Sequence, residues 1–188
     1  MAANKHLFVT LSGMMGSGKS TVRDELAKLL YASVCDLDDA LASHAGGRTI
    51  PQLFAEGEAV FREVERASLE ALVGVTLPTP CHQVIALGGG ALTHPPTREL
   101  AFSAGPSVYL RCSLPVLIER LSPAEQRAQR PLLARPDWRE TLAALLEARR
   151  EVYEQCDIIV DAEGPAPDVA QRIFEALRDR YDAADLQR

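Results

Sequence analysis

The sequence predicts a three-layer α/β fold, in which helices cover both faces of a parallel sheet of five strands. Three observations lead to this prediction. Short apolar runs alternate with amphipathic segments along most of the chain, a pattern typical of parallel strands joined by crossover helices. The length of 188 residues suits one α/β domain, so we expect residues 1–188 to form a single domain. A glycine-rich turn separates the first expected strand from the first expected helix.

Strands are expected where short apolar runs stop at polar or glycine residues. The run at 7–12 reads LFVTLS and leads directly into the glycine-rich turn. Parallel strands end at a common edge of the sheet, and ligands bind at that carboxyl edge in such folds. The five predicted strands cover residues 7–12, 33–35, 83–87, 107–110 and 157–160.

Helices are expected where apolar residues recur every three or four positions. The clearest is 137–153, because Asp137 can cap it and Glu140 follows at the third position of a capping box. The predicted helices cover residues 19–31, 36–43, 58–73, 97–102, 114–121, 137–153 and 168–181.

The composition argues against several kinds of partner. The formal net charge of −6 disfavours a nucleic-acid partner, because phosphate backbones are bound by clustered lysines and arginines. No apolar run reaches the roughly 20 residues of a membrane span. The four cysteines are far apart and show no metal-binding spacing, which favours buried thiols in a reducing compartment. We expect a cytoplasmic monomer that binds neither nucleic acid nor membrane.

The glycine-rich turn matches the phosphate-binding pattern GxxxxGK[ST] in full, between a predicted strand and a predicted helix. Its backbone N–H groups and the positive end of the helix can surround an anion. Lys19 would reach the β- and γ-phosphates, and the Ser20 hydroxyl would ligate Mg²⁺. This P-loop predicts ATP as co-substrate and Mg²⁺ as cofactor, but no particular reaction. The loop residues expected to bind ATP are Gly13, Met14, Met15, Gly16, Ser17, Gly18, Lys19, Ser20 and Thr21.

Two acidic residues and three glycines follow neighbouring predicted strands. Asp36 could complete the Mg²⁺ shell. Asp38 could take the proton from the hydroxyl group that receives the phosphate, or it could orient that hydroxyl group. One of the two could instead cap the helix that begins there. Gly88, Gly89 and Gly90 end the third strand, where they would let a ligand approach the backbone closely. A flexible turn is the alternative for the glycines.

Two arginines suggest a site for an anionic acceptor. Arg149 lies on the apolar face of the helix at 137–153, where a guanidinium must find an anion or stay unpaired at high cost. A path to the surface or a structural ion pair is the alternative. Arg62 with Glu65 three residues on would alone indicate a surface ion pair. Together with Arg149, however, Arg62 could bind a carboxylate with paired hydrogen bonds.

Residues 122–136 form a long polar connector with three arginines, and such connectors are often lids. A lid arginine that closes over the γ-phosphate would neutralise charge and exclude water. For Arg127 and Arg135 a solvated basic loop is an equal alternative. Arg130 is supported by the resemblance that follows.

The ordered set of motifs resembles the shikimate kinase family over nearly the whole chain. The phosphate loop alone is generic, whereas the later motifs in this order are specific. Those motifs are DLD at 36–38, GRTIPQLFAEGE with FREVE across 47–65, LGGGA at 87–91, RPLL at 130–133, and Arg149 with Tyr153. The resemblance implies an NMP-kinase-like P-loop fold with a substrate-binding segment at about 37–66 and a mobile lid at about 122–136. It also implies transfer of the γ-phosphate of ATP to the 3-hydroxyl of shikimate.

The resemblance implies roles for individual residues. Lys19, Asp38 and Arg130 would be catalytic, and Ser20 with Asp36 would hold Mg²⁺. Arg120 and Pro167 would flank the adenine. The residues implied to bind shikimate or shape its pocket are Asp38, Arg62, Gly88, Gly89, Gly90, Arg149, Phe54, Phe61 and Glu65.

Three departures and two alternatives accompany the resemblance. The connector before Arg130 is longer than the commonest form in the family, and Ala86 occupies a position where a small hydroxyl residue is common. Arg23 stands where the family usually has glycine, and we expect this difference to affect helix packing more than chemistry. A kinase for another acceptor, such as gluconate or a nucleoside monophosphate, is the first alternative. A non-catalytic nucleotide-binding module is the second.

Overall fold

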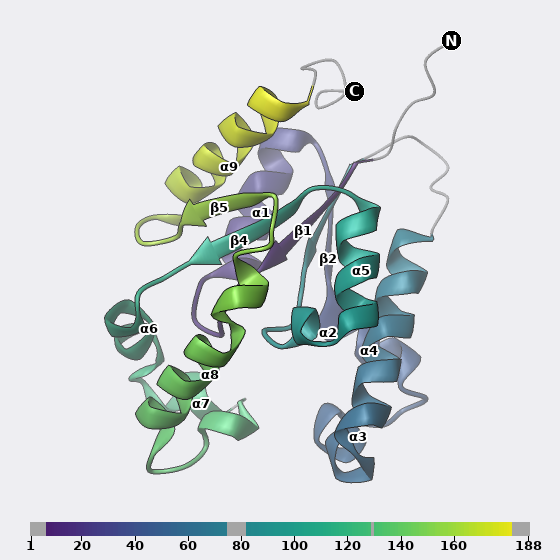
Figure 1. Ribbon diagram of the computed structural model, residues 1–188, viewed down its shortest axis with the longest axis vertical. Coiled ribbons are helices and arrows are strands. Elements are labelled where there is room, and N and C mark those ends of the chain that lie inside the picture. Colours follow the sequence, from purple (N-terminus) through teal and green to yellow (C-terminus); the bar gives the residue numbers. More distant parts are fainter. Residues whose placement is uncertain (1–6, 75–81, 129, 182–188) are drawn as a thin grey trace.

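Five parallel strands form the central sheet of the computed structural model, which describes residues 7–74, 82–128 and 130–181. The strand order is β2-β3-β1-β4-β5, and every neighbouring pair runs parallel (Figure 1). The predicted sheet is therefore confirmed. The strands are β1 (Phe8–Ser12), β2 (Ser33–Asp36), β3 (Gln83–Ala86), β4 (Ser107–Arg111) and β5 (Ile158–Asp161).

Burial follows the position of each strand in the sheet. All residues of β3 and all but the first of β1 are buried, as expected for central strands covered on both faces. The edge strands β2 and β5 contain exposed residues, among them Val34 and Ile159. The continuous apolar runs of the sequence thus correspond to the strands at the centre of the core.

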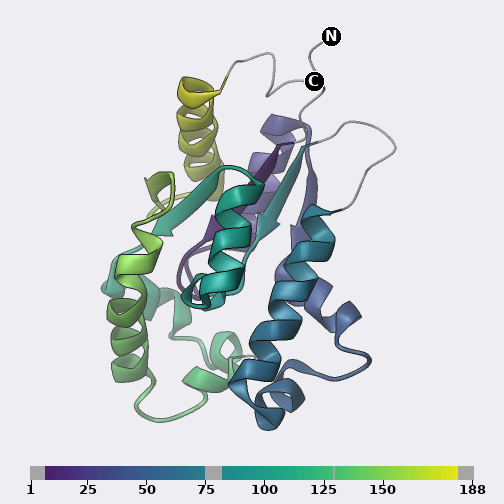
Figure 2. The ribbon, with the colours of Figure 1, turned by 45° about the vertical axis from the view of Figure 1, so that its right-hand side comes forward.

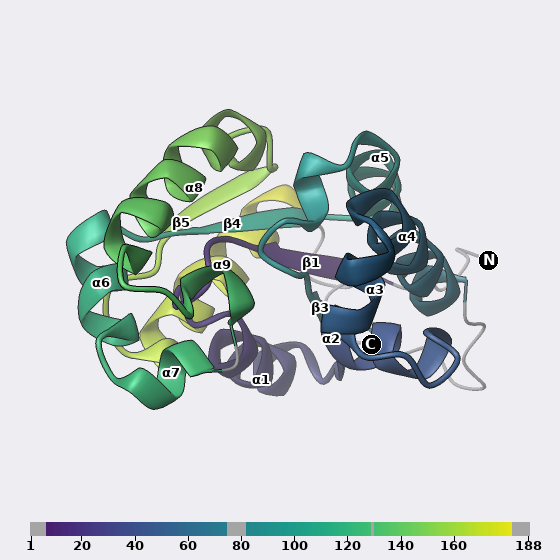
Figure 3. The ribbon, with the colours of Figure 1, turned by 90° about the horizontal axis from the view of Figure 1, so that it is seen from below.

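Helices cover both faces of the sheet, which completes the three predicted layers. Figure 3 shows α5 and α8 on one face and α1 with α9 on the other. The pair α1 and α9 pack together, as do α4 and α5, which lie side by side in Figure 2. The helices are α1 (Lys19–Leu30), α2 (Leu37–His44), α3 (Ile50–Glu56), α4 (Glu58–Val73), α5 (Pro95–Ala104), α6 (Leu114–Leu121), α7 (Ala124–Ala128), α8 (Trp138–Tyr153) and α9 (Ala166–Arg180), with 3-10 turns η1 (Ala91–Thr93) and η2 (Pro131–Leu133).

Two local features differ from the sequence prediction. The helices α3 and α7 are absent from the predicted elements, although Thr49 and Gln52 form a full capping box for α3 with proline in its first turn. The predicted side-chain cap of α8 is wrong. Asp137 occupies the N-cap position, but its carboxylate accepts a hydrogen bond from Arg135 Nε at 2.7 Å and none from the first turn of the helix.

The helices α3, α6 and α7 lie beyond the carboxyl edge of the sheet. In Figure 1, α6 and α7 lie below one side of the sheet and α3 lies below the other. Over the described residues, no helix is both long and apolar enough to cross a membrane. Cys35, Cys112 and Cys156 are free thiols, whereas Cys81 lies outside the described residues.

Candidate active site

The loop between β1 and α1 depends on glycine for its shape. Gly13, Gly16 and Gly18 all have positive φ angles, of 143°, 85° and 91°. A Cβ atom on Gly13 would also lie only 2.8 Å from the carbonyl oxygen of Leu110. Gly18 is the N-cap of α1 and provides no side-chain cap, so the first-turn N–H groups are available to an anion.

Lys19 lies across this loop, where burial and neighbouring charges lower the pKa of its ammonium group. Its Nζ donates hydrogen bonds to the carbonyl oxygens of Gly13, at 2.8 Å, and Met14, at 3.1 Å. Desolvation, with a smaller contribution from the charges of Arg130 and Arg149, lowers the pKa of Lys19 to about 8. Asp38 and Asp36 oppose this shift. The ammonium group therefore lies where added negative charge would stabilise it.

Ser20 and Asp36 offer oxygen ligands to a cation. The Ser20 hydroxyl lies 3.4 Å from Asp36 Oδ2, and the other carboxylate oxygen accepts the backbone N–H of Asp38 at 3.1 Å. Asp36 thus caps α2 with one oxygen and presents the second toward Ser20. Two hard oxygen donors at this spacing suit one Mg²⁺ shell, with phosphate and water as the other ligands. The described residues contain no cluster of three or more His, Cys, Asp or Glu that could hold a metal ion alone.

The residues predicted to bind the phosphate acceptor lie together around the three glycines that follow β3. A Cβ on Gly88 would lie 3.0 Å from Glu65 Oε1 and 3.2 Å from Asp38 Oδ1. On Gly90 it would lie 2.7 Å from Arg62 Nη2 and 3.4 Å from Arg149 Nη2. Residues from α2, α4 and α8 therefore meet over one short stretch of bare backbone. Any larger side chain there would fill the space between them.

The phosphate loop borders the same stretch. A Cβ on Gly89 would lie 3.6 Å from the carbonyl oxygen of Gly13 and 3.6 Å from the backbone nitrogen of Met15. The site for an anionic phosphate and the two convergent arginines are therefore contiguous.

Asp38 faces this junction with a perturbed carboxylate. Part of the residue is exposed to solvent, but the carboxylate oxygen approaches Gly88 and is flanked by Asp36. Desolvation, followed by the Asp36 charge, raises the pKa of Asp38, and Lys19 partly offsets the shift. A carboxylate with a raised pKa is a better proton acceptor near neutral pH.

Arg149 is buried, with 8% of the residue exposed. Its Nη1 donates to the carbonyl of Gly89 at 2.9 Å and contacts Met14 Sδ at 3.9 Å. The Tyr153 hydroxyl donates to the same carbonyl, and desolvation raises the pKa of Tyr153 to about 12. Among the described residues no carboxylate lies within ion-pair distance of Arg149, although Glu65 is near enough for the two charges to interact, so Arg149 has no direct ion-pair partner.

The Arg62 guanidinium also lies beside Gly90, but unlike Arg149 it forms ion pairs with carboxylates. Its Nη1 lies 2.7 Å from Glu65 Oε2, and its Nη2 lies 3.3 Å from Glu58 Oε1. The interpretation of Arg62 and Glu65 as a surface pair is wrong, because the Glu65 side chain is only 2% exposed. The Arg62 guanidinium also lies over the Phe61 ring, 5.1 Å from its centroid, and Phe61 stacks on Phe54 at 4.1 Å. These contacts fix the guanidinium in position.

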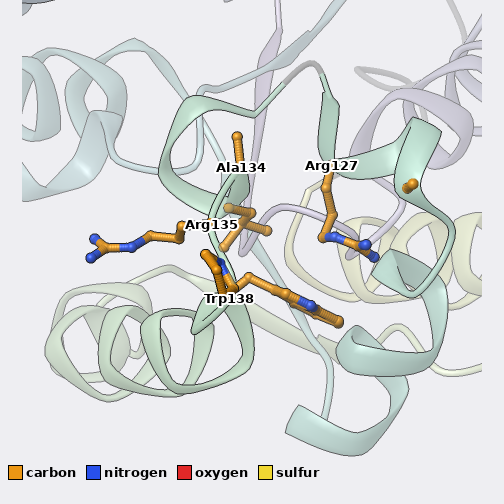
Figure 4. Close-up of a pocket in the computed structure, with 7 residues that line it drawn as sticks. Arg127, Ala134, Arg135 and Trp138 are labelled. Atoms are coloured by element: carbon orange, nitrogen blue, oxygen red, sulfur yellow. The ribbon is translucent and has the colours of Figure 1, made fainter.

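The segment at 122–136, which the sequence predicts to be a lid, carries its arginines in three different settings. Arg127 lies over the Trp138 ring, 4.6 Å from its centroid, and donates to the carbonyls of Leu121 and Ser122. Arg135 points away from Trp138, as Figure 4 shows, and pairs with Asp137. Arg127 and Arg135 both line a pocket of about 430 Å³, although the Arg135 side chain is 58% exposed.

Arg130 differs from its neighbours in the lid. It donates to the carbonyl of Gln126, and its charge is close enough to lower the pKa of Lys19. Burial also lowers the pKa of Arg130 itself. Of these three arginines, Arg130 is therefore the one whose charge contributes to the lowered pKa of Lys19.

Arg120 forms hydrogen bonds with backbone carbonyl oxygens of the phosphate loop. Its Nη1 lies 3.3 Å from the carbonyl oxygens of both Gly16 and Ser17, and its Nη2 donates to the Ala162 carbonyl at 3.0 Å. Pro167 is exposed in the first turn of α9, just beyond the loop that contains Ala162. The carbonyls that Arg120 binds are thereby tied to the loop after β5.

Sequence reasoning missed one contact at this site. Arg23 Nη1 lies 3.2 Å from Asp36 Oδ2, a contact that the expectation about helix packing did not include. No local pattern could have revealed the pair, because Arg23 is on α1 and Asp36 ends β2. Only the crossover between them brings the two side chains together.

A parallel sheet with a phosphate loop after its first strand, and convergent charged groups beside that loop, defines a P-loop nucleotide-binding protein of the small-molecule kinase type. A family model described as Shikimate kinase matches residues 15–178. The chain belongs to the shikimate kinase family.

Individual relatives agree with this assignment. The shikimate kinase of Cereibacter sphaeroides is 41% identical over 179 residues, covering 94% of this chain and 85% of that protein. The shikimate kinase of Salinibacter ruber is 39% identical over 185 residues, covering 94% and 87%. A solved structure of shikimate kinase from Acinetobacter baumannii in complex with shikimate matches with a TM-score of 0.82 and 32% identity, covering 96% of this chain and 98% of that one.

Proposed function

We propose that this protein transfers the γ-phosphate of ATP to the 3-hydroxyl of shikimate, giving shikimate 3-phosphate and ADP. One observation supports this most directly. The guanidinium groups of Arg62 and Arg149 converge over Gly90, beside Asp38 and the phosphate loop. Two adjacent cations, one without a carboxylate partner among the described residues, suit an acceptor that brings its own carboxylate. Membership of the family favours shikimate over gluconate or a nucleoside monophosphate.

The geometry suggests how these residues act on the two substrates. The loop at 13–21 would bind the phosphates, with Lys19 on the β- and γ-phosphates. Arg62 and Arg149 would bind the acceptor carboxylate and orient the ring over the glycines. The acceptor oxygen would then form a bond to the γ-phosphorus, the bond from that phosphorus to the bridging oxygen of ADP would break, and Asp38 would take the hydroxyl proton.

Other residues would support the reaction. Ser20 and Asp36 would hold Mg²⁺, which supplies positive charge to the phosphates when bound. Arg130 would close over the γ-phosphate with a lid at about 122–136, so that water is excluded. Phe54, Phe61 and Glu65 would shape the acceptor pocket with Gly88, Gly89 and Gly90, and Arg120 with Pro167 would flank the adenine. We also propose that residues 1–188 act as one domain, in a cytoplasmic monomer.

An acceptor panel tests the proposal. Purified protein, ATP and Mg²⁺ are combined in turn with shikimate, gluconate and a nucleoside monophosphate, and ADP release is measured. We expect turnover with shikimate alone. Turnover with another acceptor but none with shikimate would overturn the substrate assignment, and ATP binding without turnover on any acceptor would favour a non-catalytic module.

The pKa of Lys19 predicts a pH dependence of nucleotide binding. Below about 8 the free protein holds Lys19 protonated, and above it the group is increasingly neutral. Because phosphates stabilise the ammonium form, binding should take up a proton, and ADP affinity should fall by at most about tenfold for each pH unit above that pKa. Calorimetry in buffers of different ionisation enthalpy measures both effects. Lys19→Met should bind more weakly and lose the proton uptake, whereas an unchanged uptake would contradict the assignment.

A further inference from the structure

The Asp36 carboxylate is engaged at both oxygens before any metal binds. Oδ1 accepts the backbone N–H of Asp38 at 3.1 Å, which fixes the plane of the group at the start of α2. Oδ2 lies 3.4 Å from the Ser20 hydroxyl and 3.2 Å from Arg23 Nη1. The oxygen that faces Ser20 is therefore the one that a guanidinium already occupies.

The ion pair between Arg23 and Asp36 is partly buried. The side chains of Arg23 and Asp36 are 14% and 20% exposed, so the pair is partly shielded from water and salt. A divalent cation held between Ser20 and Asp36 would meet the positive charge of Arg23 at the same oxygen. Cation and guanidinium then compete, because one carboxylate oxygen cannot neutralise both fully.

We propose that Arg23 is a built-in counter-ion of Asp36, which Mg²⁺ must displace from Oδ2, so that Arg23 sets the Mg²⁺ concentration at which the nucleotide complex forms. This inference rests on the proposed role of Asp36 in holding Mg²⁺. Arg23 acts through Asp36 and touches no reacting atom, so it is a positioning residue. The hydrogen bond from the Asp38 N–H keeps Asp36 oriented when Arg23 leaves.

Asp24 gives the displaced guanidinium a second partner. Arg23 Nε and Nη2 each lie 2.8 Å from Asp24 Oδ1, on the same helix. Arg23 can therefore release Asp36 and remain paired. The Asp24 side chain is 52% exposed and lies one residue from Arg23 along the chain, so it can be changed without disturbing the core.

Two substitutions should shift the metal requirement in opposite directions. Affinity for ADP is measured by calorimetry at increasing Mg²⁺, and the half-saturating Mg²⁺ concentration is compared between variants. Arg23→Gln should lower that concentration about threefold to tenfold, because a unit positive charge is removed beside the metal. Asp24→Asn should raise it about twofold, because the guanidinium loses its second partner. Lys28→Gln removes the same charge from the exposed side of α1 and should change nothing.

The outcomes separate this inference from the proposed function. Asp36→Asn should raise the Mg²⁺ requirement strongly, and no change there would overturn the assignment of Asp36 as a metal ligand. A shift for Asp36→Asn with none for Arg23→Gln would overturn the role of Arg23 alone. A higher requirement in Arg23→Gln would also overturn it, since Arg23 would then be needed to hold Asp36 in place.

Discussion

Replacing Asp38 with asparagine is expected to lower kcat by about 10²–10⁴-fold while nucleotide affinity stays within about threefold of the original. The amide keeps the shape of the side chain but cannot accept a proton from the acceptor hydroxyl. Asp38 lies beside Gly88 at the junction between the phosphate loop and the two arginines, where a proton acceptor would act. Asp36, rather than Asp38, caps α2 with its side chain, so the substitution should not unfold the helix.

The pH dependence of kcat/KM provides a second test of the same substitution. Desolvation and the Asp36 charge raise the pKa of Asp38, so kcat/KM of the wild type should fall as the pH drops through that raised pKa. Asp38→Asn should lose this acid limb. Asp39→Asn, at an exposed position in the same helical turn, is the matched control and should keep the acid limb, shifted slightly to lower pH because the Asp39 charge also raises the pKa of Asp38. Unchanged kcat in Asp38→Asn would rule out the proposed proton acceptor.

Replacing Arg149 with alanine is expected to raise the KM for the acceptor by about 100-fold or more, with a change of less than about fivefold for ATP. Arg149 is buried, hydrogen-bonded to Gly89 and without a carboxylate partner among the described residues. A carboxylate bound there gains charge-assisted hydrogen bonds in a setting with little water, where such bonds are strong. Initial rates with varied acceptor and saturating ATP measure the effect.

Controls separate lost binding from lost folding. Arg150→Ala removes the same side chain from the exposed face of α8, where Arg150 pairs with Glu147, and should leave both KM values unchanged. Arg149→Lys keeps the charge but lacks the planar fork, so its KM for the acceptor should lie between wild type and alanine. Circular dichroism and thermal melting show whether each variant is folded. Equal losses for acceptor and ATP in a folded Arg149→Ala protein would contradict the acceptor site.

The fold could be predicted from the sequence because its signals are local. Apolar runs and helical periodicity located all five strands, and the predicted bounds of the helices Glu58–Val73 and Leu114–Leu121 match the structure. The phosphate loop could be read in the same way, since one unbroken stretch of chain supplies it. The helix Ile50–Glu56 was missed despite its capping box, because its short apolar content shows little periodicity.

The amino-acid sequence by itself determined the order of strands and helices, the phosphate loop and the presence of an arginine on an apolar helix face. Each of these depends on residues that are neighbours along the chain. Only the tertiary structure decided that Arg62 meets Arg149 over Gly90, that Glu65 is buried, and that Arg23 pairs with Asp36. Those contacts join different elements, and the crossovers and packing of the sheet set the distance between them.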